Sequence, residues 1–137
     1  MSELHDLNTK VIGEFRENKG IVGGNFEGSN LLLLHTIGAR TGQSRINPLV
    51  YLADDECFII VASFAGSPSS PPWFHNLKAS PEVDIEVGDE VFRAKATILE
   101  EPDRSTLYSK VEDAMPIFTE YQAKTTRVIP VISLQRM

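Results

Sequence analysis

The sequence predicts an α+β fold in which about six mainly antiparallel strands close into a small barrel. Apolar, β-branched runs of strand length recur along the 137 residues, an amphipathic segment precedes the first run, and short helical segments precede the last. Closure removes the unpaired edges that an open sheet would expose. The length suits one domain, residues 1–137. The alternative is an open antiparallel sheet with helices on one face.

An N-terminal covering helix is expected over residues 3–18. Ser2 suits its N-cap and Gly20 its end. The polar face mixes acids with few bases, which does not favour a helix on a membrane surface. Its apolar residues recur at three- and four-residue spacings: Leu4, Leu7, Val11, Ile12 and Phe15.

The first half of the chain predicts a meander of strands, joined by a glycine-flanked loop and by an acidic turn at residues 54–56. Residues 64–72 are rich in proline and small residues, which predicts an ordered loop, and Pro71 and Pro72 then favour a short helix over 73–78. The predicted strands are Leu31–Ile37, Ile46–Leu52 and Cys57–Ser63.

The second half predicts a hairpin, two helices and a final strand. The hairpin residues alternate between apolar and polar around the Gly88-Asp89 turn, as in a sheet with one solvated face. Met115-Pro116 separates the helices. In order, the predicted elements are strands Pro81–Val87 and Val91–Leu99, helices Pro102–Val111 and Ile117–Ala123, and strand Val128–Leu134.

The composition of the chain argues against several classes of function. A net charge of −6 and a pI near 5.0 argue against nucleic-acid binding, which needs a broad basic face. No apolar run is long enough to span a bilayer and the N-terminus has no apolar signal segment, so we expect no membrane association. Cys57 is the only cysteine, which suits a reducing compartment, and we expect a cytoplasmic protein. No histidine has partners at metal-ligand spacing, so no metal is predicted.

The segment GARTGQSRINPL, residues 38–49, is the most informative part of the chain. It places Arg40 and Arg45 in a glycine-flanked loop, and no Asp or Glu occurs from Gly28 to Ala53. Guanidinium forks and backbone N–H groups in such a loop suit a phosphate. The alternative is an ordinary hairpin turn whose arginines are solvated.

Together with the strand end Val61-Ala62-Ser63 and the later segment WFHNLKASP, residues 73–81, this loop resembles the deazaflavin-dependent nitroreductase family. The resemblance runs from about Leu31 to Val131. That family consists of split β-barrel, FMN-binding-like oxidoreductases that use the deazaflavin coenzyme F420. The resemblance therefore implies a split β-barrel and F420 as cofactor.

The resemblance also implies roles for individual residues. Ala39, Arg40 and Thr41 would contact the coenzyme phosphate, and Arg45 would close the clamp. Phe118 and Tyr121 would lie over the substrate face. Separately from the resemblance, the proton for the reaction could come from water or from Ser63 or Tyr121, the two candidate catalytic residues. The residues that would flank the ring are Ile46, Asn47, Pro48, Leu49, Val50, Val61, Ala62, Ser63, Phe64, Pro72, Trp73, Phe74, His75 and Asn76.

These observations predict an F420-dependent reductase that passes a hydride to a hydrophobic, electron-poor acceptor such as a quinone, an enone or a nitro compound. One alternative is an FMN-dependent reductase of the same fold, because the arginine clamp would serve the FMN phosphate equally well. Another is a non-catalytic carrier of the coenzyme or a related small molecule, because Phe64 and Ser69 stand where the family usually has basic residues. Either a monomer or a homodimer is compatible with the sequence.

Overall fold

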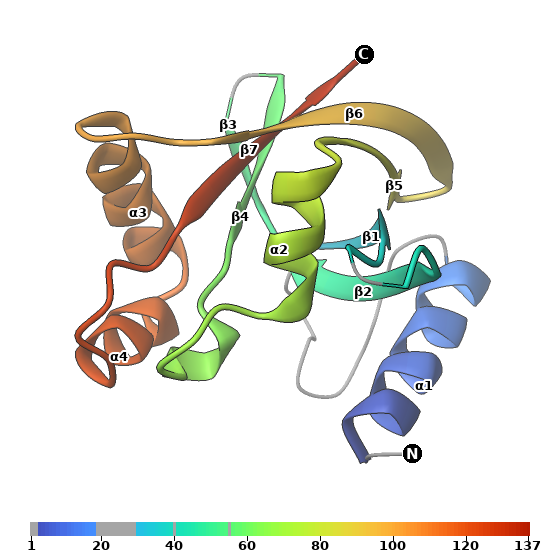
Figure 1. Ribbon diagram of the computed structural model, residues 1–137, viewed down its shortest axis with the longest axis horizontal. Coiled ribbons are helices and arrows are strands. Elements are labelled where there is room, and N and C mark those ends of the chain that lie inside the picture. The colour runs from blue at the N-terminus through green and yellow to red at the C-terminus, as the bar shows by residue number, and fades with distance from the viewer. Residues whose placement is uncertain (1–2, 19–29, 40, 55) are drawn as a thin grey trace.

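The computed structural model describes residues 3–18, 30–39, 41–54 and 56–137 (Figure 1). The predicted cap Ser2 and the predicted stop Gly20 lie outside these residues. No helix in this part of the chain is long and apolar enough to cross a bilayer. In order, the elements are α1 (Glu3–Glu17), β1 (Leu31–Ile37), β2 (Ser44–Val50), β3 (Leu52–Asp54), β4 (Cys57–Val61), the 3₁₀ turn η2 (Phe64–Gly66), α2 (Pro72–Ala79), β5 (Glu82–Val87), β6 (Glu90–Ile98), α3 (Asp103–Ala114), α4 (Ile117–Ala123) and β7 (Val131–Arg136).

The strands form one seven-stranded antiparallel sheet in the order β2-β1-β5-β6-β7-β4-β3. Its two end strands, β2 and β3, are separated in the chain by Tyr51 alone. The sheet must therefore curl until its ends meet at this residue, which makes a barrel with one bent strand. The predicted α+β class and split-barrel fold are confirmed.

The bend at Tyr51 corrects the predicted strand Ile46–Leu52. Its first part belongs to β2 and pairs with β1, whereas Leu52 begins β3 and pairs with β4. The Tyr51 N–H donates to the carbonyl of Asn30, 3.0 Å away. The expected meander therefore passes through this bend.

Strand β1 is buried on both faces because two different layers cover it. Leu32 and Leu34 point into the barrel core, and Leu31 and Leu33 pack with Val11 and Phe15 of α1. A strand covered on both faces reads as a continuous apolar run. Helix α1 thus packs on the sheet through Val11 and Phe15.

Helix α2 contributes Trp73, Phe74 and Leu77 to the barrel core, and it lies between the β1–β2 side and the β4–β7 side of the sheet (Figure 1). Helices α3 and α4 lie together on the far side of β4 and β7 from α2 (Figure 1). The side chains of Tyr108, Val111 and Phe118 are buried there against Ile59 and Val131. Helix α2 and the pair formed by α3 and α4 thus lie on different sides of β4 and β7 (Figure 1).

Several predicted strand ends differ from the structure, and two of the differences have a clear physical cause. The third predicted strand stops at Val61 instead of Ser63, because the carbonyls of Ala62 and Ser63 accept hydrogen bonds from the guanidinium of Arg127. The last strand begins at Val131 instead of Val128. Pro130, which has no N–H to donate, comes just before it, and its carbonyl accepts the N–H of Ala62.

Candidate functional site

A cleft of about 1630 Å³ opens between α1, the 38–45 loop with β2, the segment 61–72, α2 and α4. Drug-sized ligand pockets measure roughly 300–1,000 Å³, so this cleft has room for a large coenzyme and a second molecule. Most of the predicted site residues line it: Ala39, Thr41, Arg45, Ile46, Asn47, Pro48, Leu49, Val50, Val61, Ser63, Phe64, Pro72, Trp73, His75, Asn76, Phe118 and Tyr121.

The structure does not bring every predicted residue to the cleft. Ala62 is fully buried and Phe74 nearly so, and both side chains belong to the barrel core. Ala62 directly follows the strand whose Ile60 also points inward, and Phe74 lies on the buried face of α2. Arg40 lies outside the described residues. Ala62 and Phe74 are therefore not among the residues that line the cleft.

The 38–43 loop is closed by its own backbone. The Gly38 N–H donates to the carbonyl of Gln43 (2.8 Å), and the Gly42 N–H donates to the carbonyl of Gly38 (2.9 Å). Gly42 has φ +71°, a conformation that glycine adopts without strain. A Cβ on Gly38 would lie 2.7 Å from the Thr41 Oγ1. The positive φ makes glycine the favoured residue at position 42, whereas a Cβ at position 38 would have to displace the Thr41 hydroxyl.

Asn76 fastens the same loop to α2. Its Oδ1 accepts the Ala39 N–H (2.9 Å), and its Nδ2 donates to the Oγ1 of Thr36 (3.0 Å). The Asn76 and Thr36 side chains are both buried. The polar atoms of Asn76 thus hold the loop instead of a ligand, and the Ala39 N–H is already used.

Two donors on this side of the cleft remain free for an anion. In the described part of the chain, neither the Thr41 N–H nor the Arg45 guanidinium has a protein acceptor, and both residues are exposed. No Asp or Glu is among the described residues that line the cleft. An anion here meets directed donors and no like charge.

The opposite wall of the cleft is apolar. It is formed by Met115, Ile117, Phe118 and Tyr121 from the α4 region. The Phe118 and Tyr121 rings meet edge to face, with centroids 5.4 Å apart. Within the described residues, the Tyr121 hydroxyl makes no hydrogen bond, so it is available to a ligand. Such a wall suits a flat, apolar molecule.

Tyr108 of α3 fixes the position of this wall. Its hydroxyl donates to the carbonyl of Phe118 at 2.6 Å in a buried contact. Burial raises the pKa of the Tyr108 phenol to about 12, so the hydroxyl stays protonated and remains a donor at neutral pH.

The turn after β4 completes the cleft with Ser63 and Phe64. Phe64 has φ 48°, the only positive φ of a residue other than glycine in the described part of the chain. Such a conformation costs about 1–3 kcal/mol and persists only where the surroundings enforce it. The strained residue lies directly beside Ser63, a candidate proton donor.

Several lining residues were not predicted. Met115 and Ile117 adjoin the predicted Phe118, and Ser70 and Pro71 adjoin the predicted Pro72, so extending each motif by a few residues would have found them. Thr9 and Ile12 come from α1, and no local signal connects them with the loop. Gly38 and Ser44 complete the loop itself.

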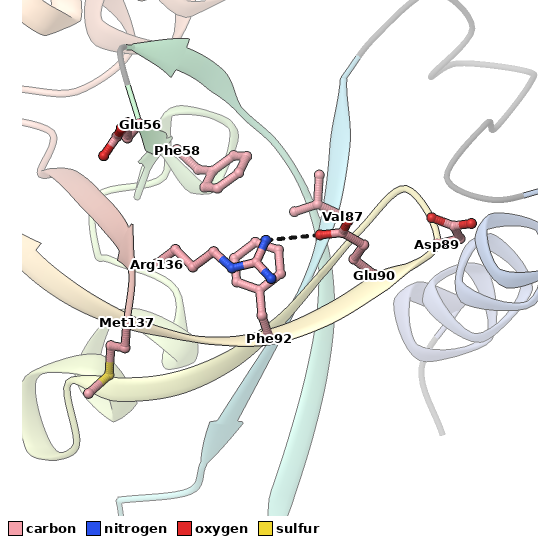
Figure 2. Close-up of a pocket in the computed structure, with 8 residues that line it drawn as sticks. All are labelled: Glu56, Phe58, Val87, Asp89, Glu90, Phe92, Arg136 and Met137. Carbon is pink, nitrogen blue, oxygen red and sulfur yellow. Dashed lines mark hydrogen bonds and ion pairs between the residues drawn. The ribbon is translucent and has the colours of Figure 1, made fainter.

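A second, smaller cleft of about 660 Å³ is built by the β5–β6 hairpin, the start of β4 and the end of β7. Figure 2 shows the Arg136 side chain lying over the Phe92 ring and reaching Glu90. The distance from Arg136 Nη1 to Glu90 Oε2 is 2.9 Å. Glu56 and Asp89 also line this cleft, so its net charge repels a phosphate.

Comparison with known proteins shows the family of this chain. The model of the F420H(2)-dependent quinone reductase family matches residues 9–136. The chain is 43% identical over 126 residues to an F420H(2)-dependent quinone reductase of Mycobacterium tuberculosis, covering 89% of this chain and 85% of that protein. The sequence motifs had predicted an F420-using family, which is confirmed.

Solved structures of similar proteins have the same fold. A structure described as the F420-H2 dependent reductase FDR-A superimposes with a TM-score of 0.71 and 36% identity, covering 77% of this chain and 94% of that one. Another, described as a domain-swapped dimer, gives a TM-score of 0.73 at 29% identity, with 98% of this chain and 100% of that chain covered.

Proposed function

This chain belongs to the F420H(2)-dependent quinone reductase family, and we propose that its large cleft is where reduced F420 and a quinone meet. The chain is thus an F420-dependent oxidoreductase. The observation that carries the proposal for the site is a cleft with no Asp or Glu among its described lining residues, with hydrogen-bond donors on one wall and aromatic side chains on the other.

In this proposal, the coenzyme phosphate binds at the 38–45 loop. Thr41 offers a backbone N–H and Arg45 a guanidinium, and the bond from Asn76 to Ala39 holds the loop in shape without a ligand. A preformed anion site saves the entropy of ordering a loop on binding. The ring then lies along Ile46–Val50, where Pro48 stands in an edge strand that pairs only with β1.

When bound, reduced F420 supplies a hydride. A quinone that accepts a hydride must also gain a proton to become a hydroquinone. Ser63 and Tyr121 both line the cleft and carry hydroxyl groups, and they are the residues proposed to deliver this proton. The apolar α4 wall positions the acceptor and keeps water away from it.

We propose the cytoplasm as the compartment, supported by the single, unpaired Cys57. For the assembly we propose a monomer or a homodimer, and the structural relative described as a domain-swapped dimer supports the second.

The test is steady-state oxidation of reduced F420 by menadione, with a nitro compound and an enone as parallel acceptors. We expect purified protein to quench F420 fluorescence on binding and to catalyse turnover with the quinone. Titrations with FMN and haem serve as controls. Tight FMN binding without F420 binding would assign the site to FMN, and F420 binding without turnover of any acceptor would make the protein a carrier.

A further inference from the structure

Arg127 lies between α4 and β7 and binds the segment that follows β4. Its side chain is partly buried and donates four hydrogen bonds. Nε donates to the carbonyl of Ser67 (3.0 Å) and Nη1 to the Oγ of Ser70 (3.1 Å). Nη2 donates to the carbonyls of Ala62 (3.1 Å) and Ser63 (2.9 Å). The planar fork of a guanidinium can serve these acceptors together, whereas a lysine ammonium on its flexible stem cannot.

These bonds account for the burial of Arg127. Within the described residues, Arg127 forms no ion pair with a carboxylate. Burial lowers the pKa of its guanidinium, because no carboxylate compensates the charge. Among the described residues, the hydrogen-bond acceptors of the guanidinium are carbonyl and hydroxyl oxygens of residues 62–70. The Arg127 side chain therefore holds the segment 62–70 in position.

The backbone of Arg127 holds the other wall of the cleft. Its carbonyl accepts a hydrogen bond from the Nε2 of Gln122 on α4, 2.8 Å away. The Oε1 of Gln122 accepts from the Nη2 of Arg104 (3.2 Å), which connects α4 to α3. Gln122 is adjacent in sequence to Tyr121, whose side chain lines the cleft. One residue is therefore bonded to both walls between which the acceptor would lie.

We propose that Arg127 is a positioning residue that sets the separation between the Ser63–Phe64 turn and α4. This inference rests on the proposed function. Arg127 is not among the residues that line the cleft, so it acts through the segment it holds. The 38–45 loop, where the coenzyme phosphate is proposed to bind, lies on a different wall of the cleft. It is held separately, by the hydrogen bond that the Ala39 N–H donates to Asn76. Loss of the hydrogen bonds from Arg127 should therefore affect hydride transfer more than coenzyme binding.

The test compares Arg127→Lys with Arg93→Lys. Arg93 is exposed on β6 and pairs with Asp84 far from the cleft residues, so it controls for the chemical change. For Arg127→Lys we expect kcat with menadione to fall by about tenfold or more, because small misplacements of reacting groups are costly. The F420 dissociation constant should change by less than roughly threefold, because separately held sites behave independently. Arg93→Lys should change neither.

Hydrogen exchange of the ligand-free protein provides a readout that does not depend on activity. Amides of residues 62–70 should exchange faster in Arg127→Lys than in the wild type and in Arg93→Lys, while the barrel strands stay protected. If Arg127→Lys does not fold, Ser70→Ala removes one of the four bonds and should give the same changes at smaller amplitude.

The proposal requires both the faster exchange and the selective loss of kcat. Either result alone, or equal losses of kcat and coenzyme affinity, overturns it. If the wild-type protein neither binds F420 nor reduces menadione, the proposed function fails instead, and the exchange rates still show whether Arg127 holds the segment.

Discussion

Gly66 packs directly against the backbone of Tyr121, so that a Cβ on Gly66 would lie 2.8 Å from the Tyr121 carbonyl oxygen. Gly66 also has φ +80°, a conformation that other residues rarely adopt. The turn after β4 and helix α4 thus touch at this point, and both contribute residues to the cleft. Close approach of two backbones is possible here only because glycine has no side chain.

Gly66→Ala should therefore lower the free energy of unfolding by about 1–3 kcal/mol, because strain and a steric clash add at one position. Chemical denaturation by urea measures the change. Gly13→Ala is the matched control: a Cβ at this exposed position of α1 would meet nothing within 4 Å. That variant should be neutral or up to about 1 kcal/mol more stable. Equal effects of the two substitutions would contradict the packing described.

Arg45→Ala tests the proposed phosphate clamp. Because Arg45 is exposed and unpaired within the described residues, its removal should leave the melting temperature nearly unchanged. Loss of a charge-assisted contact should weaken F420 binding by about 1.5–3 kcal/mol, or roughly 10- to 150-fold. Fluorescence titration measures the affinity, with Arg93→Ala as a control for the loss of an exposed arginine. Unchanged affinity would remove Arg45 from the site.

Substitutions at Asn76 and Thr36 separate loop anchoring from core stability. Both Asn76→Ala and Thr36→Val remove the bond between the two side chains and should destabilise the protein by about 1–3 kcal/mol, because a buried polar group loses its partner. Only Asn76→Ala also releases the Ala39 N–H, so only this variant should weaken F420 binding. A double-mutant cycle in urea measures the coupling. Equal loss of coenzyme affinity in both single variants would argue against an anchor at Ala39.

The contact between α1 and the sheet should weaken in acid. Arg16 donates to Glu86 at 2.9 and 3.2 Å, and His35 Nε2 lies 2.6 Å from the Glu86 Oε2. Hydrogen bonding from Arg16, and then from His35, lowers the pKa of Glu86 below its ordinary 4.5. The stabilisation is therefore present above pH 4.5 and is lost as the pH falls through the lowered pKa of the folded state.

Glu86→Gln should accordingly reduce the dependence of unfolding free energy on pH in this acidic range. Unfolding measured at several pH values below neutrality tests this expectation. Asp84→Asn is the control, because it removes an exposed carboxylate of the same strand. If the unfolding free energy of Glu86→Gln depends on pH as strongly as that of the wild type, the Arg16–Glu86 pair does not make the contact between α1 and the sheet sensitive to acid.

Much of the barrel could be predicted because its apolar runs are distinct and are separated by glycine, proline and acidic turns. Leu31–Ile37 was predicted with its bounds. The bend at Tyr51 could not be, because the apolar pattern continues through it and no glycine or proline marks it. The break depends instead on closure of the sheet, which joins distant strands.

The candidate site, like the fold, could be predicted where local sequence motifs mark it and not where it depends on contacts between distant residues. Residues of the loop and of α2 are marked by local motifs, and most of them line the cleft. Arg127 was missed because its partners lie some 60 residues away, at Ser67 among others. In the sequence it resembles any exposed arginine. The inward orientation of Ala62 and Phe74 also follows from packing, which residue type alone does not reveal.

A crystal structure of the protein with oxidised F420 tests the central claim most directly. The account predicts the coenzyme phosphate within hydrogen-bonding distance of the Thr41 N–H and the Arg45 guanidinium, and the ring between Ile46–Val50 and the α4 wall. Coenzyme bound elsewhere, or a phosphate that does not contact the 38–45 loop, would contradict it.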